Sequence, residues 1–230
     1  SDRRRKQRRF VVSAVVAAAA LILIALVNRD FFFPKDESLL EFSVANGTRF
    51  DVSHAAGFSD GDRNVLGSGS TIALSQGVVE LDFYSGVQAI IQAPARLTIL
   101  DSGTVQLAHG TGRFSVPEAA IGFEVLTDEL NLVDLGTEFG VICGEDVADQ
   151  LHVFKGEVEI ASRRSKAERQ SVFGGHARIV DEEGTLSSTA LAEHVFMDHL
   201  PAELPYLHWP LDASRDGVFA VQGTHPLSSV

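Results

Sequence analysis

Two carboxylates and a threonine lie close together near the middle of the chain, at Asp134, Thr137 and Glu138. Paired carboxylates can act as a general acid and a general base, so this group is the first candidate for catalysis. The segment Asp134-Leu135-Gly136-Thr137 lies between two stretches of strand character, where Asp and Thr side chains commonly bind backbone N–H groups and glycine supplies a turn. We therefore favour a structural role, and we expect Glu138→Gln to have little effect unless Glu138 contacts a partner.

Other residue types in the chain could bind ions or act as nucleophiles. Asp60-Gly61-Asp62-Arg63-Asn64 opens like a calcium loop, but the glycine and glutamate required later in such a loop are missing, which favours a polar turn. Cys143 has no histidine near it in the sequence, so we expect a buried or idle thiol. The histidines of the body lack metal-ligand spacing and are expected at the surface of strands or loops: His54, His109, His152 and His176. The sequence thus predicts no catalytic residue, no metal and no cofactor, and we expect no enzymatic activity.

Short strands are the elements that position these residues. Over residues 70–181, apolar and polar residues alternate in short runs, and glycines separate the runs. A period of two with β-branched and aromatic residues indicates half-buried strands, and no helical stretch interrupts them. Strand–turn units that recur about every 8–12 residues are typical of a sandwich or a short solenoid. We therefore expect an all-β domain over residues 70–181, either a short-stranded sandwich or a solenoid-like fold.

An apolar segment precedes this β-body. Residues 10–27 carry no charge, and their 18 residues approach the length that a helix needs to cross the roughly 30 Å hydrocarbon core of a membrane. The basic residues of the preceding tail, residues 1–9, keep that end in the cytoplasm. We expect a single transmembrane helix in the inner membrane, with the body in the periplasm and residues 28–69 as a linker. A cleaved signal peptide is the alternative, but the apolar run is longer than usual and ends on Val27 rather than a small residue.

The charge is distributed unevenly along the chain. The whole sequence has 19 Lys and Arg against 31 Asp and Glu, for a net charge of −12, while residues 1–29 hold seven basic side chains and one acidic one. The body is therefore more acidic than the average, and we expect no nucleic-acid partner, because phosphates are bound by clustered Lys and Arg.

Three aromatic residues follow the apolar segment. Phe31, Phe32 and Phe33 would lie at the outer interface of the membrane that this segment crosses, where aromatic rings are favoured, or would pack on the following domain.

Several stretches of the β-body resemble the FecR domain, the extracytoplasmic part of many bacterial anti-sigma factors. They are residues 122–127, 133–141 and 152–158, and the most specific is Asp-Leu-Gly-Thr-Glu-Phe-Gly-Val at 134–141. The resemblance covers about half of the chain, and one departure is Ala93, where relatives often have glycine before the proline. It implies that the following are family-motif residues with structural roles: Asp134, Gly136, Thr137, Phe139 and Gly156.

The resemblance also implies a function. In FecR proteins a cytoplasmic region binds an extracytoplasmic-function sigma factor, and the exported domain receives a signal, often from an outer-membrane transporter. A basic tail, one membrane helix and an exported domain is also the usual order in that family. We therefore expect a single-pass signal-transduction protein that regulates a sigma factor, with the sigma-binding element in a segment before Ser1.

The end of the chain indicates a second possibility. Residues 182–204 are polar and are expected to form a connector, helical in part at most because Pro201 limits any helix. Trp209-Pro210-Leu211-Asp212 then resembles the opening strand of a laminin-G or concanavalin-like module, which would occupy residues 205–230 and continue beyond them. This favours the alternative of a membrane-anchored carbohydrate- or protein-binding protein, with a glycan as its partner and the FecR-like domain as a scaffold.

Overall fold

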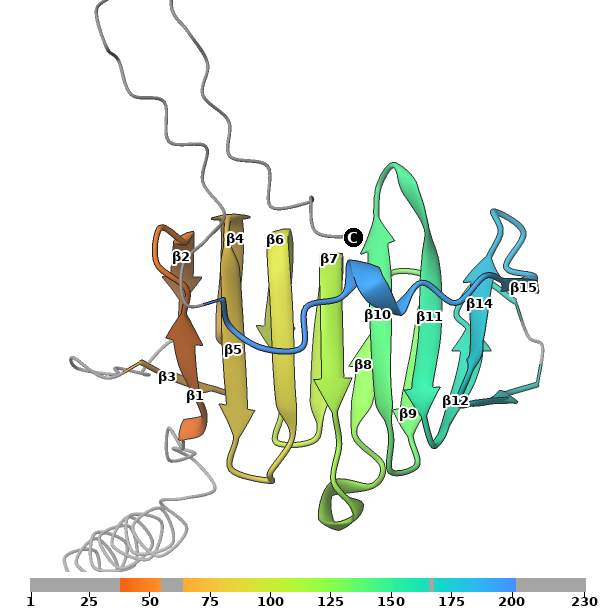
Figure 1. Cartoon of the computed structure of the whole chain (residues 1–230), viewed down its shortest axis with the longest axis horizontal. Helices are drawn as coiled ribbons and strands as arrows, with labels where there is room; N and C mark the ends of the chain where they lie inside the picture. The colour runs from red at the N-terminus through yellow and green to blue at the C-terminus, as the bar shows by residue number, and fades with distance from the viewer. Residues whose placement is uncertain (1–37, 55–63, 166–167, 202–230) are drawn as a thin grey trace, which may run out of the picture.

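The computed structural model describes residues 38–54, 64–165 and 168–201, which form a domain of β-strands (Figure 1). Its only helices within these ranges are two single 3-10 turns, η1 (Glu118–Ala120) and η2 (Glu193–Val195). The prediction of an all-β domain is therefore confirmed for the described residues. The strands are β1 (Ser38–Val44), β2 (Arg49–Ser53), β3 (Val65–Gly67), β4 (Thr71–Gln76), β5 (Val78–Phe83), β6 (Gln88–Ile99), β7 (Thr104–Ser115), β8 (Glu124–Leu126), β9 (Leu130–Asp134), β10 (Glu138–Gly144), β11 (Val147–Lys155), β12 (Glu157–Ser162), β13 (Gln170–Phe173), β14 (His176–Val180) and β15 (Leu186–Thr189).

These strands belong to one hydrogen-bonded sheet that folds over on itself. The long strands β6 and β7 produce the fold because each changes partners halfway along: β6 pairs first with β5 and then with β4, and β7 pairs first with β8 and then with β10. One layer has the order β3-β1-β5-β6-β7-β10-β11-β14-β15, and the other has the order β2-β4-β6-β7-β8-β9-β12-β13. We call them the first and second layers. They form a sandwich, one of the two expected arrangements.

Small residues allow the strands to pass from one layer to the other. Gly110 in β7 has φ +130°, and a Cβ added there would lie only 2.5 Å from the Cβ of Ala95 in β6. Gly77, between β4 and β5, has φ +95°. Only glycine combines this backbone conformation with so close an approach at little cost. These bends and the β10–β11 hairpin lie at one end of the sandwich. The connections β5–β6, β7–β8, β9–β10, β11–β12 and β13–β14 lie at the opposite end, which we call the loop end (Figure 1).

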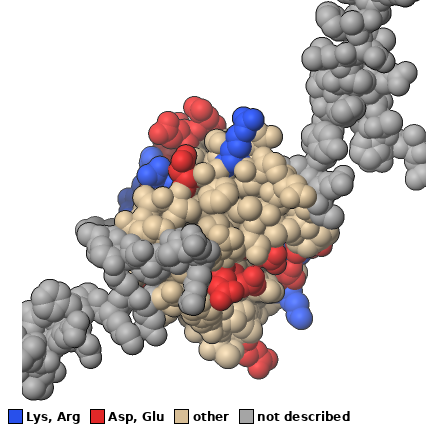
Figure 2. Space-filling view, turned by 90° about the vertical axis from the view of Figure 1, so that its left-hand side faces the viewer, with Lys and Arg blue, Asp and Glu red and all other residues tan. Residues whose placement is uncertain are grey.

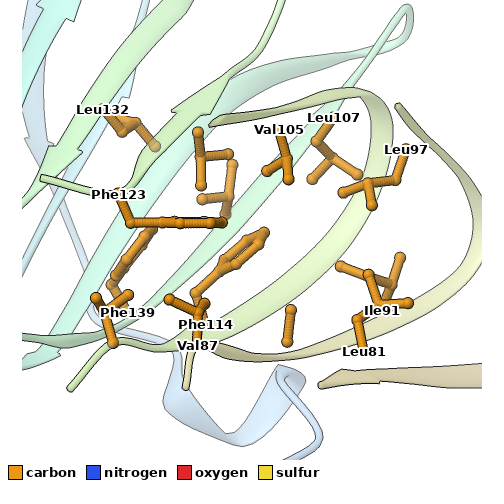
Figure 3. Close-up of a cluster of buried hydrophobic side chains, with 14 of the residues drawn as sticks. Leu81, Val87, Ile91, Leu97, Val105, Leu107, Phe114, Phe123, Leu132 and Phe139 are labelled. Atoms are coloured by element: carbon orange, nitrogen blue, oxygen red, sulfur yellow. The ribbon is translucent and has the colours of Figure 1, made fainter. Parts of the chain in front are cut away.

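The apolar side chains of the two layers meet in one core, part of which is shown in Figure 3. Aromatic rings form its centre: Phe114 stacks on Phe139 with ring centroids 5.2 Å apart, and Phe83 meets Phe123 edge-on at 5.3 Å. In β12 and β9, buried residues alternate with partly buried ones, as expected for strands with one face toward a core. Burial of each large apolar side chain stabilises the fold by about 1.5–3 kcal/mol, so the core is what joins the layers.

The predicted linker over residues 28–69 is wrong in its described part. Strands β1, β2 and β3 lie within that range, and β1 pairs with both β3 and β5. Leu40, Phe42 and Leu66 are buried, because the alternation along Leu40-Glu41-Phe42-Ser43 directs one face of β1 into the core. The domain described by the structure therefore begins at Ser38, not at residue 70, and continues past residue 181 to include β15.

The structure of residues 182–201 also differs from the predicted connector over residues 182–204. Its first part forms β15, paired with β14. Residues 190–201, which we call the strap, then run across the outer face of the first layer, as the blue segment in Figure 1 shows. Phe196 is buried, and Met197 and Leu200 pack against a small cluster formed by Ala45, Val78 and Ile90, so burial of apolar side chains holds the strap on the sheet.

Several predictions concern residues outside the described ranges. They are the membrane helix at 10–27, the first four residues of the calcium-like segment 60–64, and the C-terminal module at 205–230. In the part of the chain that the structure describes, no helix is long and apolar enough to cross a membrane. Figure 2 turns the β1–β2 side of the domain toward the viewer; uncharged side chains cover most of this face, with acidic and basic groups mainly near its margins.

Candidate functional site

The stretch that resembles the FecR domain forms a turn from the second layer to the first, at the loop end. Asp134 ends β9, and its Oδ2 accepts a hydrogen bond of 2.6 Å from the backbone N–H of Gly136. The backbone N–H of Asp134 donates to the carbonyl of Phe123, and its carbonyl accepts from Gly122, both at 2.9 Å. One residue thus closes its own turn and ties that turn to the neighbouring connection between β7 and β8.

Asp134 is an acid in an unusual environment. Its side chain is fully buried, and burial raises the pKa of Asp134 to about 6, although backbone N–H groups of Gly136 and Thr137 act in the opposite direction. Its Oδ1 and the buried Oγ1 of Thr137 have no hydrogen-bond partner among the described residues. A pKa near neutrality suits a group that exchanges protons, but neither of the two surface hollows described below is lined by Asp134.

Two glycines allow the turn to pack tightly. Gly136 has φ +90°, and Gly156, in the connection between β11 and β12, has φ +84°. A Cβ added at Gly156 would lie 2.5 Å from the carbonyl oxygen of Gly136 and 2.6 Å from Cγ2 of Thr137. The two connections therefore touch through backbone atoms. Phe139, two residues beyond Thr137, is fully buried in the core against Phe114.

Glu138 does not form a carboxylate pair with Asp134. It lies on the outer face of the first layer, where its Oε1 accepts hydrogen bonds from Nε and Nη2 of Arg113 at 2.8 and 2.6 Å. Nη2 of Arg113 also binds Glu193 of the strap at 3.1 Å, and the guanidinium lies 4.4 Å from the ring centroid of Phe154. Arg113 therefore connects β7, β10 and the strap through charge and through a cation–π contact.

The strap is held most firmly around Phe196. Its ring lies over Gly140, between His152 at 5.2 Å and Phe154 at 5.4 Å. A Cβ added at Gly140 would lie 2.4 Å from Cε1 of Phe196, so the absence of a side chain on β10 creates the place for the ring. Gln92 also binds the strap, because its Oε1 accepts a 2.7 Å hydrogen bond from the backbone N–H of Met197.

His152 was expected at the surface, and that prediction is wrong. It is buried beneath the strap, its Nδ1 accepts from the N–H of Ala192 at 3.3 Å, and its Nε2 lies 3.2 Å from Oε1 of Gln150. This pattern corresponds to a neutral ring with its proton on Nε2. Burial lowers the pKa of His152, because the charged ring would lose its hydration. The strap comes from residues 40 positions further along the chain, so local alternation could not reveal this cover.

Two surface hollows lie at the end opposite the loop end. One, of about 530 Å³, is lined by His109, Cys143 and Val147 among others, and the other, of about 640 Å³, by Glu145, Asp146 and several other acidic residues. Cys143 is buried, as expected, and burial raises the pKa of its thiol well above the ordinary value. Among the described residues, no group of three His, Cys, Asp or Glu side chains has a geometry that could hold a metal ion.

The structure thus brings four of the five motif residues to one contact and places the fifth in the core. Asp134, Gly136, Thr137 and Gly156 meet at the loop end, and Phe139 packs behind them. The sequence reasoning missed the strap and the residues that hold it: Gln92, Arg113, Gly140, Phe154 and Phe196. The only local signals were the glycine at 140, in the middle of a strand, and the apolar pair Phe196-Met197 in a polar segment.

The domain is similar to two crystal structures of candidate anti-sigma factors from Parabacteroides distasonis. For the one determined at 1.65 Å, the TM-score is 0.47 and the identity 18%, over 54% of this chain and 62% of the other. For the one determined at 2.50 Å, the TM-score is 0.45 and the identity 16%, over 68% of this chain and 63% of the other. The chain therefore spans less than two thirds of either protein. No protein-family model matches the sequence, and no curated protein matches it.

Proposed function

We propose that this chain belongs to a single-pass membrane protein whose exported FecR-like domain regulates an extracytoplasmic-function sigma factor. The observation that carries the proposal is the stretch at 134–141, the most FecR-like part of the sequence. Its Asp134, Thr137 and Phe139 are buried, and its turn joins the two layers of the domain. A motif that fixes the turn and part of the core supports an FecR-like domain more strongly than a set of surface residues would.

The order of charge and hydropathy along the chain supports the membrane topology of this proposal. Seven basic side chains lie within residues 1–29, the uncharged run occupies residues 10–27, and the body carries the acidic excess. The proposed orientation has the basic tail in the cytoplasm and the β-domain in the periplasm. The sigma factor would bind a cytoplasmic segment before Ser1, and an outer-membrane transporter is the proposed source of the signal.

Co-purification from the native host tests this function. The full-length protein, tagged and extracted in detergent, is expected to retain one extracytoplasmic-function sigma factor, identified by mass spectrometry. Deletion of its gene is expected to change transcription several-fold at the promoters of that sigma factor and to leave other promoters unchanged. The matched control is full-length protein lacking the segment before Ser1, which should lose the sigma factor. Absence of any sigma factor together with unchanged transcription would contradict the proposal.

The second candidate function is presentation of a carbohydrate-binding module. The segment Trp209-Pro210-Leu211-Asp212 favours it, since it resembles the opening of a laminin-G or concanavalin-like module and begins eight residues after the strap ends. In that case the FecR-like domain serves as a membrane-anchored scaffold. Binding of the full-length protein to members of a glycan array, without a retained sigma factor, would favour this second function over the first.

A further inference from the structure

Large apolar side chains are exposed on the connections at the loop end. Tyr84, Ile121, Leu135 and Phe173 have exposed fractions of 60%, 53%, 38% and 55%. Tyr84, Ile121 and Leu135 lie in the connections between β5 and β6, β7 and β8, and β9 and β10. Phe173 is the last residue of β13 and adjoins the connection between β13 and β14. Isolated exposed apolar residues are ordinary on a protein surface, but four at one end of a domain define a possible contact surface. We call these four side chains the apolar tip.

The connections that carry the apolar tip touch one another in series. A Cβ placed on one glycine of a connection would be in contact with, or overlap, the next connection. The distances from such an added Cβ are 3.3 Å from Gly86 to Pro117, 3.5 Å from Gly136 to Ile121, 2.5 Å from Gly156 to the carbonyl oxygen of Gly136, and 3.4 Å from Gly174 to the backbone nitrogen of Gly156. The turns therefore form one continuous surface, whose shape is fixed by contacts with backbone atoms and with the side chains of Pro117 and Ile121. Such a surface can present its apolar groups together without reorganising.

The described chain enters the domain at this same end. Strand β1 begins at Ser38, and the backbone N–H of Tyr84 donates a 3.0 Å hydrogen bond to the carbonyl of Leu39. The uncharged run at residues 10–27 ends only ten residues before Ser38. A fully extended chain of that length spans at most about 35 Å, so an anchor at 10–27 would keep the loop end close to the bilayer.

We infer that the apolar tip rests on the outer surface of the cytoplasmic membrane, with the four side chains inserted at the level of the lipid headgroups. The inference rests on the proposed function, because the single anchor supplies the tether. Side chains of the Tyr, Phe, Leu and Ile types suit this depth, where an amphipathic ring or an aliphatic chain can leave water. The tether raises the local concentration of lipid around the tip, so even weak insertion holds the domain in one orientation.

The charges at the two ends favour this orientation. The end opposite the tip carries the acidic hollow lined by Glu145, Asp146, Asp181, Glu182 and Glu183. Placing that end against a bilayer would bring these carboxylates close to anionic lipid phosphates. The loop end carries fewer acidic groups, Asp101, Glu118 and Glu157, together with Lys155. Insertion therefore depends on the apolar groups and does not require anionic lipid.

Depth-dependent quenching in vesicles tests the inference. The full chain would be reconstituted into phosphatidylcholine vesicles, with an environment-sensitive fluorophore attached through Phe173→Cys or, independently, through Leu135→Cys. The matched control is Val147→Cys, since Val147 is an apolar residue exposed by 48% at the opposite end. Cys143 stays in every variant, because its thiol is buried. Doxyl-labelled lipid is expected to quench both tip probes several-fold more than the control probe, with a blue shift of emission at the tip alone.

The outcomes separate the inference from the proposed function. If the chain floats with the vesicles but both tip probes are quenched no more than the probe at 147, the inference is overturned and the anchored protein stands; a protein partner would then be the occupant of the tip. If the chain does not float with the vesicles, the anchor is absent and both proposals fail. If anionic lipid is required for quenching at the tip, insertion of apolar groups is not the cause, and the inference is likewise overturned.

Discussion

The turn at 134–137 leads into the first layer and the strap crosses the outer face of that layer, but the two are held in different ways. The turn is fixed by backbone contacts, with Gly156 against Gly136 and the Asp134 carboxylate on a backbone N–H. The strap is held across the sheet by the buried ring of Phe196, by the packing of Met197 and Leu200, and by a few polar contacts. Loss of the turn must disturb the core behind it, whereas the strap can lift from the sheet while the sandwich remains intact. The strap is therefore the part of the domain that we expect to open first.

The largest effect is expected from Gly156→Val. The new side chain would overlap the carbonyl of Gly136 and would also force a branched residue to φ +84°. We expect a loss of about 3 kcal/mol or more in the free energy of unfolding, because overlap and backbone strain add. Urea unfolding of the full chain in detergent, followed by circular dichroism, measures this loss.

Gly175→Val is the matched control for that variant. Gly175 has φ +85°, but a Cβ added there would meet no atom within 4 Å. The strain of the backbone is therefore tested without the overlap, and we expect a smaller loss, of about 1–2 kcal/mol. Equal losses at positions 156 and 175 would show that the contact between the two connections does not stabilise the fold.

Phe196→Ala is expected to release the strap. The ring loses its contacts with His152 and Phe154, at a cost of about 3 kcal/mol that falls on the strap alone. Hydrogen exchange followed by mass spectrometry should show faster exchange in residues 190–201 and unchanged protection in β9 and β12. Gly140→Ala should have the same effect from the sheet side, since its Cβ would occupy the place of the ring. Faster exchange through the whole domain would contradict a strap that lifts independently.

Acidification is expected to act on the two regions with opposite signs. The pKa of His152 is lowered by burial, so its contribution to stability is complete above pH 6.5 and falls as the pH drops below that value. The pKa of Asp134 is raised by burial from 3.8 to about 6, so its contribution to stability is lost as the pH rises through 6 and is complete below 3.8.

Unfolding at pH 7 and pH 5 separates these contributions. Relative to the unmodified chain, His152→Gln should lose less stability between pH 7 and pH 5, and Asp134→Asn should lose more, because each variant lacks one titrating group. Identical pH dependence in all three proteins would show that neither residue is buried as described. In hydrogen exchange, the unmodified chain should show a strap that exchanges faster at the lower pH after correction for the intrinsic rate.

The smallest effect is expected from Glu193→Gln. Glu193 is exposed and holds Arg113 through a single contact of 3.1 Å, so its removal should cost about 0.5 kcal/mol and only in the strap. Glu138→Gln should cost somewhat more, because Glu138 accepts two hydrogen bonds from the same guanidinium. A double-mutant cycle with Arg113→Met, which removes the charge, measures both couplings, and a larger coupling for Glu193 than for Glu138 would contradict this ranking.

The sequence revealed most of the second layer and the core but little of the strap. Alternation of apolar and polar residues is a local signal, so strands such as β9 and β12 could be predicted from five or six residues each. The same signal is present in β1, but it was hidden by the polar segments on both sides, which favoured a linker. The first-layer residues Gly140, His152 and Ile90 face outward in their strands and are buried only because the strap covers them.

The candidate site likewise has features that the local sequence predicts and features that depend on distant segments. Asp134, Gly136 and Thr137 act on neighbouring backbone atoms, so a turn could be inferred from their types and spacing alone. The contact of that turn with Gly156 and the role of Arg113 depend on connections that meet only after folding. Glu138 shows the difference most clearly, since its neighbours in sequence indicated no partner for it, whereas its position in the sheet gives an ion pair with Arg113.

Topology mapping tests the central claim, that the β-domain works outside the cytoplasmic membrane on a single anchor. Alkaline phosphatase, which is active only after export, would be fused after Thr189, with a fusion before Ser1 as the control. We expect high activity for the fusion after Thr189 and background activity for the fusion before Ser1. Background activity after Thr189, from a fusion protein present in normal amounts, would place the domain in the cytoplasm and contradict the account.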